Sequence, residues 1–541
     1  METRRTTQTR GGGGSFPTST LISPRSLPLL PDSDLLAPDT HALPRKTKIV
    51  CTIGPTSDDR ESLFRLADMG MNVARLNMSH GDHASHKAVV DLVKEYNASG
   101  RGCVAIMLDT KGPEVRSGDL VSPIDMQPGG LITFTIDPAN GTGNRVSVNY
   151  DGFIDDVSVG DTLLVDGGMN SLLIKTKTER DVGCEVVDGG ILKSRRHLNI
   201  RGKSANLPAI TDKDWLDLKF GIEMGVDYYA LSFVRNADVI YELKAFLAAQ
   251  GAEIGVLAKI ESADSVENLE QILDAVDGAM VARGDLGAEL PVEEVPFWQS
   301  RIVQGCRKRG KPVIVATNML ESMILNPTPT RAEVSDISIA VREGTDAIML
   351  SGESAYGSFP FKSVDVMRTV ATRTERAQRA YTGTRRYGSE EAEAIDWIVP
   401  PTRGDGGGMS APGLSEMFAY HATTMANTIR TSLVVFSRKG NMPVLLSHYR
   451  PDYPIYAFTE SEAVQRRLAL YNGVTALRMP FGPAADATFD AAIAELKARG
   501  YVRGGQQVAI VQSGRQPIWR QASTHAIQVR SVPRDPVVEE E

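Results

Sequence analysis

The 541-residue sequence predicts an α/β protein: a closed (β/α)8 (TIM) barrel with a small β-barrel lid domain inserted into it, followed by a C-terminal α/β domain. Eight short, nearly continuous apolar segments alternate with amphipathic stretches, which is typical of parallel strands covered by helices on both faces. A long β-like insert interrupts this alternation between the third and fourth segments. A chain of this length is also expected to divide into several domains.

The eight barrel strands are predicted from apolar runs that end in polar or charged residues. Amphipathic stretches such as residues 262–276 and 296–309 lie between them and are predicted to be helices. Residues 45–112 and 207–385 are therefore assigned to the barrel. The predicted strands are residues 48–53, 72–77, 104–109, 228–233, 255–261, 278–283, 313–317 and 347–351.

Residues 113–206 are assigned to the inserted lid domain. Its segments alternate or run apolar, and the pairs Asp166-Gly-Gly and Asp188-Gly-Gly mark turns between them. A domain mounted over the active face could exclude water from the reaction. The strands predicted within it are residues 131–136, 145–149, 162–165 and 172–177.

The last part of the chain is predicted to be a linker and a third domain. Residues 386–412 are rich in Gly, Pro and charge, as linkers are. Residues 413–541 are assigned to the C-terminal α/β domain, which carries no charged cluster like that of the barrel and is assigned no chemistry. Its predicted elements are a helix over residues 415–431 and strands over residues 433–436, 455–458 and 507–511.

The first 44 residues differ from the rest in composition. They contain four arginines, many Ser and Thr and a run of four glycines, and Glu2 is the only acid before residue 32. This composition predicts an organelle transit peptide, and the alternative is a disordered tail without function.

Charge and cysteine content exclude several classes of function. The formal net charge of −8 argues against general nucleic-acid binding, and no run of about 18 uncharged apolar residues predicts a membrane span. The four cysteines form no CxxC pair, so neither a disulfide framework nor a zinc site is expected. They are Cys51, Cys103, Cys184 and Cys306.

Polar residues gather at the C-terminal ends of the predicted barrel strands. In a closed barrel these ends converge on one face, which is where catalysis is found. Lys259 and Glu261 are two residues apart, so on a strand they point to the same face. The residues at or just after the strand ends are Arg75, Asn77, Asp109, Ser232, Arg235, Lys259, Glu261, Asp285, Thr317 and Ser351.

Two cation sites are predicted from the side-chain oxygens at and just after these strand ends. Glu261 and Asp285 would repel each other unless a cation lay between them, and Mg²⁺ typically uses one or two carboxylates plus substrate oxygens. The alternative is a salt bridge of Lys259 with one of them. Four oxygens with one formal charge suit a monovalent ion, and their alternative is hydrogen bonding to loop backbone. These four come from Asn77, Ser79, Asp109 and Thr110.

An anion site is predicted beside the metal. The run Arg283-Gly-Asp-Leu-Gly287 is a turn into a short helix, where small residues let backbone N–H groups approach an anion. Arg75 and Arg116 could clamp phosphate oxygens, although a solvated surface position is the commoner fate of one arginine. This face of the barrel would thus hold a lysine, carboxylates, a metal and a phosphate together. Such a combination suits the transfer of a phosphoryl group.

At this level of detail the sequence resembles the pyruvate kinases. The resemblance covers roughly residues 45–530 and follows the order of the family's signatures. It is closest to the plastid-type enzymes of plants and algae through Asp166-Gly-Gly-Met169, Ser194-Arg-Arg-His-Leu198 and Gln512-Ser-Gly-Arg-Gln-Pro-Ile-Trp519. The family signatures are Lys48-Ile-Val-Cys-Thr-Ile-Gly-Pro55, Ala74-Arg-Leu-Asn-Met-Ser-His-Gly81, Leu108-Asp-Thr-Lys-Gly-Pro-Glu-Val-Arg116, Ala258-Lys-Ile-Glu261, Ala282-Arg-Gly-Asp-Leu-Gly287, Ala316-Thr-Asn-Met-Leu-Glu-Ser-Met323, Pro329-Thr-Arg-Ala-Glu-Val-Ser-Asp336 and Met349-Leu-Ser-Gly-Glu-Ser354.

The resemblance implies a reaction and its cofactors. It implies transfer of the phosphoryl group of phosphoenolpyruvate to ADP, giving pyruvate and ATP, in the last step of glycolysis. It also implies Mg²⁺ (or Mn²⁺) and K⁺, a homotetramer or a hetero-oligomer with related subunits, and the plastid stroma, with the cytoplasm as the alternative. Two other functions remain open: a Mg²⁺-dependent barrel lyase acting on pyruvate enolate, and a regulatory subunit of a larger pyruvate kinase.

The resemblance also assigns roles to residues. By resemblance, Arg75 binds the transferring phosphate and Lys259 stabilises its transition state. Gly284, Asp285 and Thr317 lie at the substrate carboxylate and enolate, and Thr317 and Ser351 belong to the route that protonates the enolate. The implied metal ligands are Glu261 and Asp285 for Mg²⁺ and Asn77, Ser79, Asp109 and Thr110 for K⁺; the implied nucleotide-side residues are Asn77, His80, Arg116 and Arg196.

Three positions vary within the family or depart from its pattern. Arg196 stands where many members have lysine, which puts its nucleotide role in doubt. Glu114 resembles the K⁺-dependent members, since those without that dependence usually carry lysine there. Residues 437–442 lack the Ser/Thr-rich pattern that holds fructose 1,6-bisphosphate in many members, so activation by that sugar is not expected.

Overall fold

The computed structural model describes residues 43–137, 143–202, 207–385, 411–513 and 525–534. The described residues from Pro44 onward form one compact unit. The predicted transit peptide lies outside the described residues, apart from its last two positions, and so does nearly all of the predicted linker. Among the described residues, no helix is both long and apolar enough to cross a membrane.

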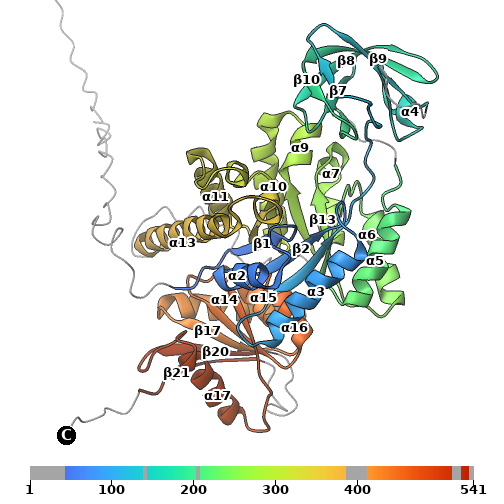
Figure 1. Cartoon of the computed structure of the whole chain (residues 1–541). Helices are drawn as coiled ribbons and strands as arrows, with labels where there is room; N and C mark the ends of the chain where they lie inside the picture. The colour runs from blue at the N-terminus through green and yellow to red at the C-terminus, as the bar shows by residue number, and fades with distance from the viewer. Residues whose placement is uncertain (1–42, 138–142, 203–206, 386–410, 514–524, 535–541) are drawn as a thin grey trace, which may run out of the picture. The chain divides into compact units, whose positions relative to one another are not determined.

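Eight parallel strands close into a barrel, which confirms the predicted fold class (Figure 1). The strands follow one another around it in the order β1-β16-β15-β14-β13-β12-β3-β2. Each lies within, or overlaps, one of the eight predicted segments. Their bounds are β1 Lys48–Thr52, β2 Val73–Asn77, β3 Ala105–Asp109, β12 Tyr228–Leu231, β13 Gly255–Ile260, β14 Gly278–Ala282, β15 Val313–Ala316 and β16 Ala347–Leu350.

Helices surround the strands and cover the outer face of the barrel (Figure 1). Several begin at a capping box in which Asp, Thr or Ser accepts a backbone N–H: Asp82 does so for α3 and Thr330 for α11. Glycines in the left-handed conformation end α5 and α11. The main helices are α2 Arg60–Met69, α3 His83–Ala98, α5 Asp212–Met224, α6 Asp238–Ala249, α8 Leu269–Ala275, α10 Val295–Lys308, α11 Arg331–Glu343 and α13 Pro360–Arg385.

Short helices lie near the C-terminal ends of several barrel strands. They are α7 Ala263–Glu267, α9 Arg283–Glu289, η1 Val292–Glu294, η2 Glu321–Ile324 and α12 Gly352–Ala355. Of these, α9 begins directly after β14, α7 and α12 begin three and two residues after β13 and β16, and η2 begins five residues after β15.

A repeated aspartate holds the strand register at the opposite end of the barrel. Asp227, Asp277 and Asp346 each lie directly before the first residue of a strand. The carboxylate of each accepts the backbone N–H of the neighbouring strand, from Ile106, Val256 and Val313 respectively, at 2.8–3.1 Å. These bonds satisfy N–H groups that a strand end would otherwise leave unpaired.

Alternate strand residues point into the barrel, and this parity decides where the polar strand ends lie. Val73, Ala105 and Leu257 belong to the inner core cluster, together with Met107 and Met280. Two or four residues further along the same strands come Arg75, Asp109, Lys259 and Glu261. Because side chains alternate with a period of two, these charged groups continue the inward-facing row above the apolar layers.

The insert between β3 and α5 has its own core of buried apolar residues, which includes Phe134, Phe153 and Leu172. A six-stranded sheet runs in the order β11-β7-β8-β9-β5-β6, and a two-stranded sheet pairs β10 with β4. One helical turn, α4 Phe153–Asp156, interrupts the strands. The strands are β4 Ile124–Met126, β5 Leu131–Thr135, β6 Arg145–Ser147, β7 Thr162–Val165, β8 Asn170–Lys177, β9 Asp181–Asp188, β10 Gly190–Leu192 and β11 Leu198–Ile200.

The C-terminal part is a five-stranded sheet in the order β19-β18-β17-β20-β21, with separate apolar clusters on its two faces. Only β21 is antiparallel to its neighbour. β19 and β21 were not among the predicted strands. The elements are α14 Ala411–Thr428, β17 Ser432–Phe436, α15 Asn441–His448, β18 Ile455–Thr459, α16 Glu462–Leu468, β19 Val474–Arg478, α17 Ala485–Ala498, β20 Gln507–Ser513 and β21 His525–Ser531.

Candidate active site

Four charged side chains meet inside the C-terminal mouth of the barrel. The Arg75 Nε donates to Asp109 Oδ2 at 2.6 Å. The Lys259 Nζ lies 3.4 Å from Asp109 Oδ1 and 3.1 Å from Glu261 Oε2, and it donates to Ser232 Oγ at 2.8 Å. All four groups are almost fully buried, so their charges act on one another and on a bound ligand with little screening by water.

The charges within this cluster are set by burial and by the neighbouring groups. Burial disfavours the ammonium of Lys259, but the carboxylates of Asp109 and Glu261 outweigh it and raise the pKa of Lys259 above its ordinary value. Burial likewise opposes ionisation of Asp109, but Arg75 and Lys259 lower its pKa. Lys259 is therefore a fixed positive charge at the centre of the site.

Glu261 differs from Asp109, because burial raises its pKa to about 8 and Asp285 adds to this effect against the opposing pull of Lys259. Its Oε1 accepts the N–H of Phe233 at 2.6 Å. Lys259 lies close to Oε2, but outside hydrogen-bond geometry, so this buried oxygen accepts no hydrogen bond from the described residues. A buried carboxylate oxygen of this kind fits a cation ligand.

The salt bridge foreseen as the alternative is thus present, since Lys259 pairs with both Asp109 and Glu261. The Lys259 ammonium lies 3.1 Å from the same Glu261 Oε2 that accepts no hydrogen bond, so a cation bound there would share this oxygen with Lys259. Asp285 lies half-buried in the first turn of α9. No group of three or more His, Cys, Asp and Glu side chains forms a metal cage in the described ranges. A divalent cation held by Glu261 and Asp285 would take its other ligands from substrate oxygens and water.

The four residues predicted to hold a monovalent cation lie at the ends of two adjacent strands: Asn77 and Asp109 end β2 and β3, and Ser79 and Thr110 follow them. Asn77 and Asp109 are register partners in β2 and β3. Asn77 Oδ1 also accepts the N–H of Ser79 at 3.1 Å. The Thr110 hydroxyl accepts the N–H of Ser232 at 3.0 Å and donates weakly to the carbonyl of Ala230. Asn77 and Thr110 thus hydrogen-bond to backbone, as the alternative interpretation expected, and the monovalent-cation site stays a prediction.

The loop after β15 is held in an unusual conformation beside α9. Thr317 and Asn318 have φ of 64° and 55°, which is rare for residues with a side chain and costly for a β-branched one. The Thr317 Oγ1 accepts the N–H of Gly284 at 2.8 Å and donates to the carbonyl of Ala316 at 2.7 Å. These bonds bring Thr317, Gly284 and Asp285 together at one side of the mouth.

Two residues to which the sequence analysis gave no role fix this loop. The Arg283 guanidinium donates to the carbonyl of Thr317 at 2.6 Å and to Asp336 at 2.7 Å. The fully buried Glu353 accepts the N–H of Leu320 at 3.0 Å and that of Ser351 at 2.7 Å. Arg283 bonds residues 34 and 53 positions away, and Glu353 bonds Leu320 33 positions away, so no local pattern reveals these contacts.

The residues predicted on the nucleotide side lie mainly at the start and end of the insert. The Arg116 Nε donates to Glu114 Oε2 at 2.7 Å, and its Nη1 donates to the carbonyl of Arg195 at 2.8 Å. Arg196 lies 3.4 Å from Asp166, and its buried Nε has no hydrogen-bond partner in the described residues. His80 is exposed on the loop after β2.

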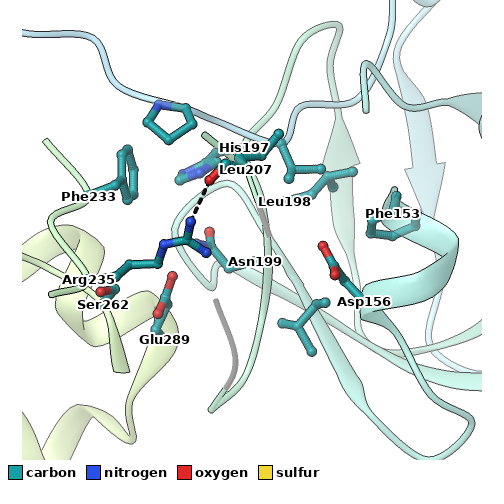
Figure 2. A pocket seen from close by; sticks show the side chains of 13 residues that line it. Phe153, Asp156, His197, Leu198, Asn199, Leu207, Phe233, Arg235, Ser262 and Glu289 are labelled. Atoms are coloured by element: carbon teal, nitrogen blue, oxygen red, sulfur yellow. Dashed lines mark hydrogen bonds between the residues drawn. The ribbon is translucent and has the colours of Figure 1, made fainter. Parts of the chain in front are cut away.

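A small cavity of about 40 Å³ lies between the insert and the barrel loops (Figure 2). His197, Leu198 and Asn199 line it from the insert, and Arg235 and Glu289 line it from the barrel (Figure 2). The Arg235 guanidinium donates across it to the carbonyl of Leu207 at 2.5 Å. Burial lowers the pKa of His197 against the opposing effect of Asp285, so the imidazole is held neutral at this junction.

Two family models together match most of the chain. The family model "Pyruvate kinase, barrel domain" matches residues 44–364, and "Pyruvate kinase, alpha/beta domain" matches residues 416–528. The chain is 60% identical to plastidial pyruvate kinase 2 of Arabidopsis thaliana over 489 residues, which is 90% of this chain and 81% of that protein.

More distant relatives agree. The chain is 57% identical to the chloroplastic pyruvate kinase isozyme G of Nicotiana tabacum over 90% of this chain and 84% of that one. It is 40% identical to the pyruvate kinase of Geobacillus stearothermophilus over 90% and 80%. The crystal structure of a pyruvate kinase from Cryptosporidium parvum superimposes with a TM-score of 0.79 at 32% identity and covers 90% of this chain and 96% of that one.

Proposed function

The chain belongs to the pyruvate kinase family, and from that premise we propose that it transfers the phosphoryl group of phosphoenolpyruvate to ADP, giving pyruvate and ATP, with Mg²⁺ (or Mn²⁺) and K⁺ as cofactors. It is a phosphotransferase, and its similarity to plastidial and chloroplastic enzymes places it in the plastid. The transfer would be the last step of glycolysis. We also propose assembly as a homotetramer or with related subunits.

The observation that carries this proposal is the buried ammonium of Lys259 between Asp109 and Glu261, beside the guanidinium of Arg75. A loose phosphoryl-transfer transition state spreads negative charge over the phosphoryl oxygens. Fixed positive charge in a water-poor site stabilises that charge without reorganisation. Lys259 and Arg75 supply such charge from two strands whose positions the closed barrel fixes.

The cation roles follow from the carboxylates and amides of the same mouth. Glu261 and Asp285 would hold the divalent cation, whose bound charge draws phosphate and substrate oxygens together. Asn77, Ser79, Asp109 and Thr110 would hold K⁺. Glu261 has a buried oxygen without a hydrogen bond, which supports the first assignment.

The remaining roles concern the substrate carbon skeleton and the nucleotide. Gly284, Asp285 and Thr317 would orient the carboxylate and enolate, because the Thr317 hydroxyl and the Gly284 N–H already meet there. Thr317 and Ser351 would belong to the route by which the enolate gains a proton. Asn77, His80, Arg116 and Arg196 would face the nucleotide, and closure of the inserted domain would exclude water.

The first experiment measures pyruvate formation from phosphoenolpyruvate and ADP with Mg²⁺, with and without K⁺. Turnover that needs ADP and rises with K⁺ is expected. Turnover without ADP would instead indicate a lyase. Binding of phosphoenolpyruvate and nucleotide without turnover would indicate a regulatory subunit that needs a partner chain.

A further inference from the structure

Glu289, the last residue of α9, makes two contacts on opposite sides of a junction. Its Oε2 accepts the backbone N–H of Ala263 at 2.8 Å. Its backbone carbonyl accepts the N–H of Gly202 at 2.8 Å. The side chain is buried, with 4% of its surface exposed, and it lines the cavity between the insert and the barrel beside Ser262 and Arg235 (Figure 2).

The first contact fixes the chain directly after a proposed metal ligand. Ala263 is the first residue of α7 and lies two positions after Glu261. Ser262 caps Ser265, but the N–H of a first helical residue has no partner within its own helix. The carboxylate of Glu289 supplies that partner from another element, so it restricts the backbone on which Glu261 is held.

The second metal carboxylate lies on the same short helix as Glu289. Asp285 and Glu289 are four residues apart on α9, which is about one helical turn. Glu289 therefore sets the spacing between the segment of Glu261 and the helix of Asp285. A divalent cation that bridges both carboxylates needs that spacing to be constant, because Mg²⁺ tolerates little distortion of its ligands.

The second contact reaches the insert. Gly202 lies just after β11, in the chain that returns from the insert to the barrel, and the N–H of its neighbour Arg201 donates to Thr162 of β7 at 3.0 Å. Through the backbone of Glu289, this returning chain is hydrogen-bonded to the helix that carries Asp285. One route by which a change in the position of the insert reaches the two proposed metal carboxylates therefore runs through Glu289.

We propose that Glu289 is a positioning residue that holds Glu261 and Asp285 at the spacing for a divalent cation and couples that spacing to the returning strand of the lid. This inference rests on the proposed function, because it assumes that Glu261 and Asp285 are the metal ligands. It assigns no contact between Glu289 and substrate or metal. Its effect passes through the N–H of Ala263 and the N–H of Gly202.

The test measures Mn²⁺ binding to the full chain without substrate, by electron paramagnetic resonance of free Mn²⁺, in four variants. Glu289→Ala removes the acceptor for Ala263 and is expected to weaken Mn²⁺ binding by about tenfold or more, as loss of outer-shell partners does. Glu289→Gln keeps an acceptor oxygen and is expected to retain most of the affinity. Glu261→Gln removes a proposed ligand and is expected to lose binding.

Glu375→Gln is the matched control, because Glu375 also accepts backbone N–H groups, from Lys46 and Thr47, but at the start of the described chain. It is expected to bind Mn²⁺ as the unchanged protein does. Wild-type affinity in a folded Glu289→Ala variant, together with loss in Glu261→Gln, would overturn the role of Glu289 alone. Wild-type affinity in Glu261→Gln would instead overturn the proposed metal site.

The coupling to the lid has its own readout in hydrogen exchange of the peptide that covers residues 198–202. Mn²⁺ is expected to slow exchange there in the unchanged protein, because it fixes α9 and the carbonyl that holds Gly202. In Glu289→Ala at saturating Mn²⁺ this slowing is expected to persist, because the variant keeps the backbone carbonyl that binds Gly202. In Glu261→Gln, which is expected to bind no Mn²⁺, it is expected to be absent. No slowing in the unchanged protein, or equal slowing in Glu261→Gln, would overturn the coupling.

Discussion

Lys259 combines two properties that rarely occur together, full burial and a firmly held positive charge. Asp109 and Glu261 maintain the charge, and Ser232 accepts one of its hydrogen bonds. The sequence predicted the three charged members, because each follows an apolar run with inward parity. It gave no role to Ser232, whose side chain reaches Lys259 only after β12 and β13 have paired.

Replacement of this lysine tests its role most directly. Lys259→Ala is expected to lower kcat by about 10³-fold or more, since a preorganised charge is lost from the transition state. The far-ultraviolet circular dichroism is expected to stay unchanged, because the barrel strands do not depend on this side chain. Steady-state kinetics beside the spectrum check this, and near-normal turnover in the folded variant would contradict the role.

Substitution of Glu114 tests whether activity depends on a monovalent cation. Its carboxylate accepts a hydrogen bond from Arg116, and although burial opposes ionisation, this bond and the nearby positive charges lower its pKa, so it carries a negative charge near the site. Glu114→Lys would place a positive charge there and is expected to raise activity without added K⁺. Activity titrated against K⁺ measures this effect. Glu95→Lys, at an exposed helix pair with Arg60, serves as the control. Unchanged K⁺ dependence would argue against the prediction.

At the scale of elements, the loops after β15 and β16 are joined by a single carboxylate. Glu353 accepts the N–H of Leu320 from one loop and that of Ser351 from the other. The two loops therefore hold Thr317 and Ser351 on a common support, which the sequence could not show because the bonded residues are 33 positions apart in one case.

Loss of this support is expected to affect both stability and turnover. Glu353→Ala leaves two backbone N–H groups without partners, and each such loss costs about 1–3 kcal/mol when buried. The temperature of thermal unfolding is expected to fall, and kcat to fall with it while the KM for ADP changes little. Calorimetry and steady-state kinetics check both effects. Glu95→Gln, which is exposed, is the control, and an effect on neither quantity would show that the loops are held by other contacts.

At the scale of the whole molecule, the C-terminal domain packs against the end of the barrel opposite the candidate active site. Arg450 donates to both oxygens of Asp346 at 2.8–2.9 Å, and Arg466 donates to Asp227 at 2.9 Å. These aspartates also hold strand N–H groups of the barrel, so the same carboxylates serve the strand register and the domain contact. Leu470 of the C-terminal domain packs against the inner barrel core.

Because of Lys48, the stability of the folded protein at this contact is expected to depend on pH. It is buried at the base of β1, its Nζ donates to the carbonyl of Val474 at 2.6 Å, and burial, aided by Arg45, lowers its pKa to about 7. An unfolded lysine keeps its proton up to about pH 10.4. Between these values the unfolded state binds more protons, so the stability of the folded protein rises with pH.

The stability of the unchanged protein relative to Lys48→Met is therefore expected to rise between pH 7 and pH 10, by up to about 1.4 kcal/mol per pH unit. Thermal unfolding of both proteins across this range measures the difference. Lys87→Met, at an exposed pair with Asp91, is the control, since that lysine is in water in both states. Parallel curves for the unchanged protein and Lys48→Met would contradict the prediction.

The sequence alone determined the barrel, the position of its insert and most of the charged site. It could do so because strand parity and apolar runs are local signals, and because one parity places Arg75, Asp109, Lys259 and Glu261 on the inner face. Among the strands that were not predicted, β19 and β21 lie at the two edges of the C-terminal sheet and are only partly buried, so their local apolar signal is weak.

Tertiary structure alone decided how the site is supported. Thr317 keeps a positive φ, against the preference of a β-branched residue, because Arg283 and Gly284 bind it from the start of α9. Glu289 and Glu353 act on residues 26 and 33 positions away. Such contacts have no sequence signal, since they depend on which strand ends the closed barrel brings side by side, and closure is a property of all eight strands together.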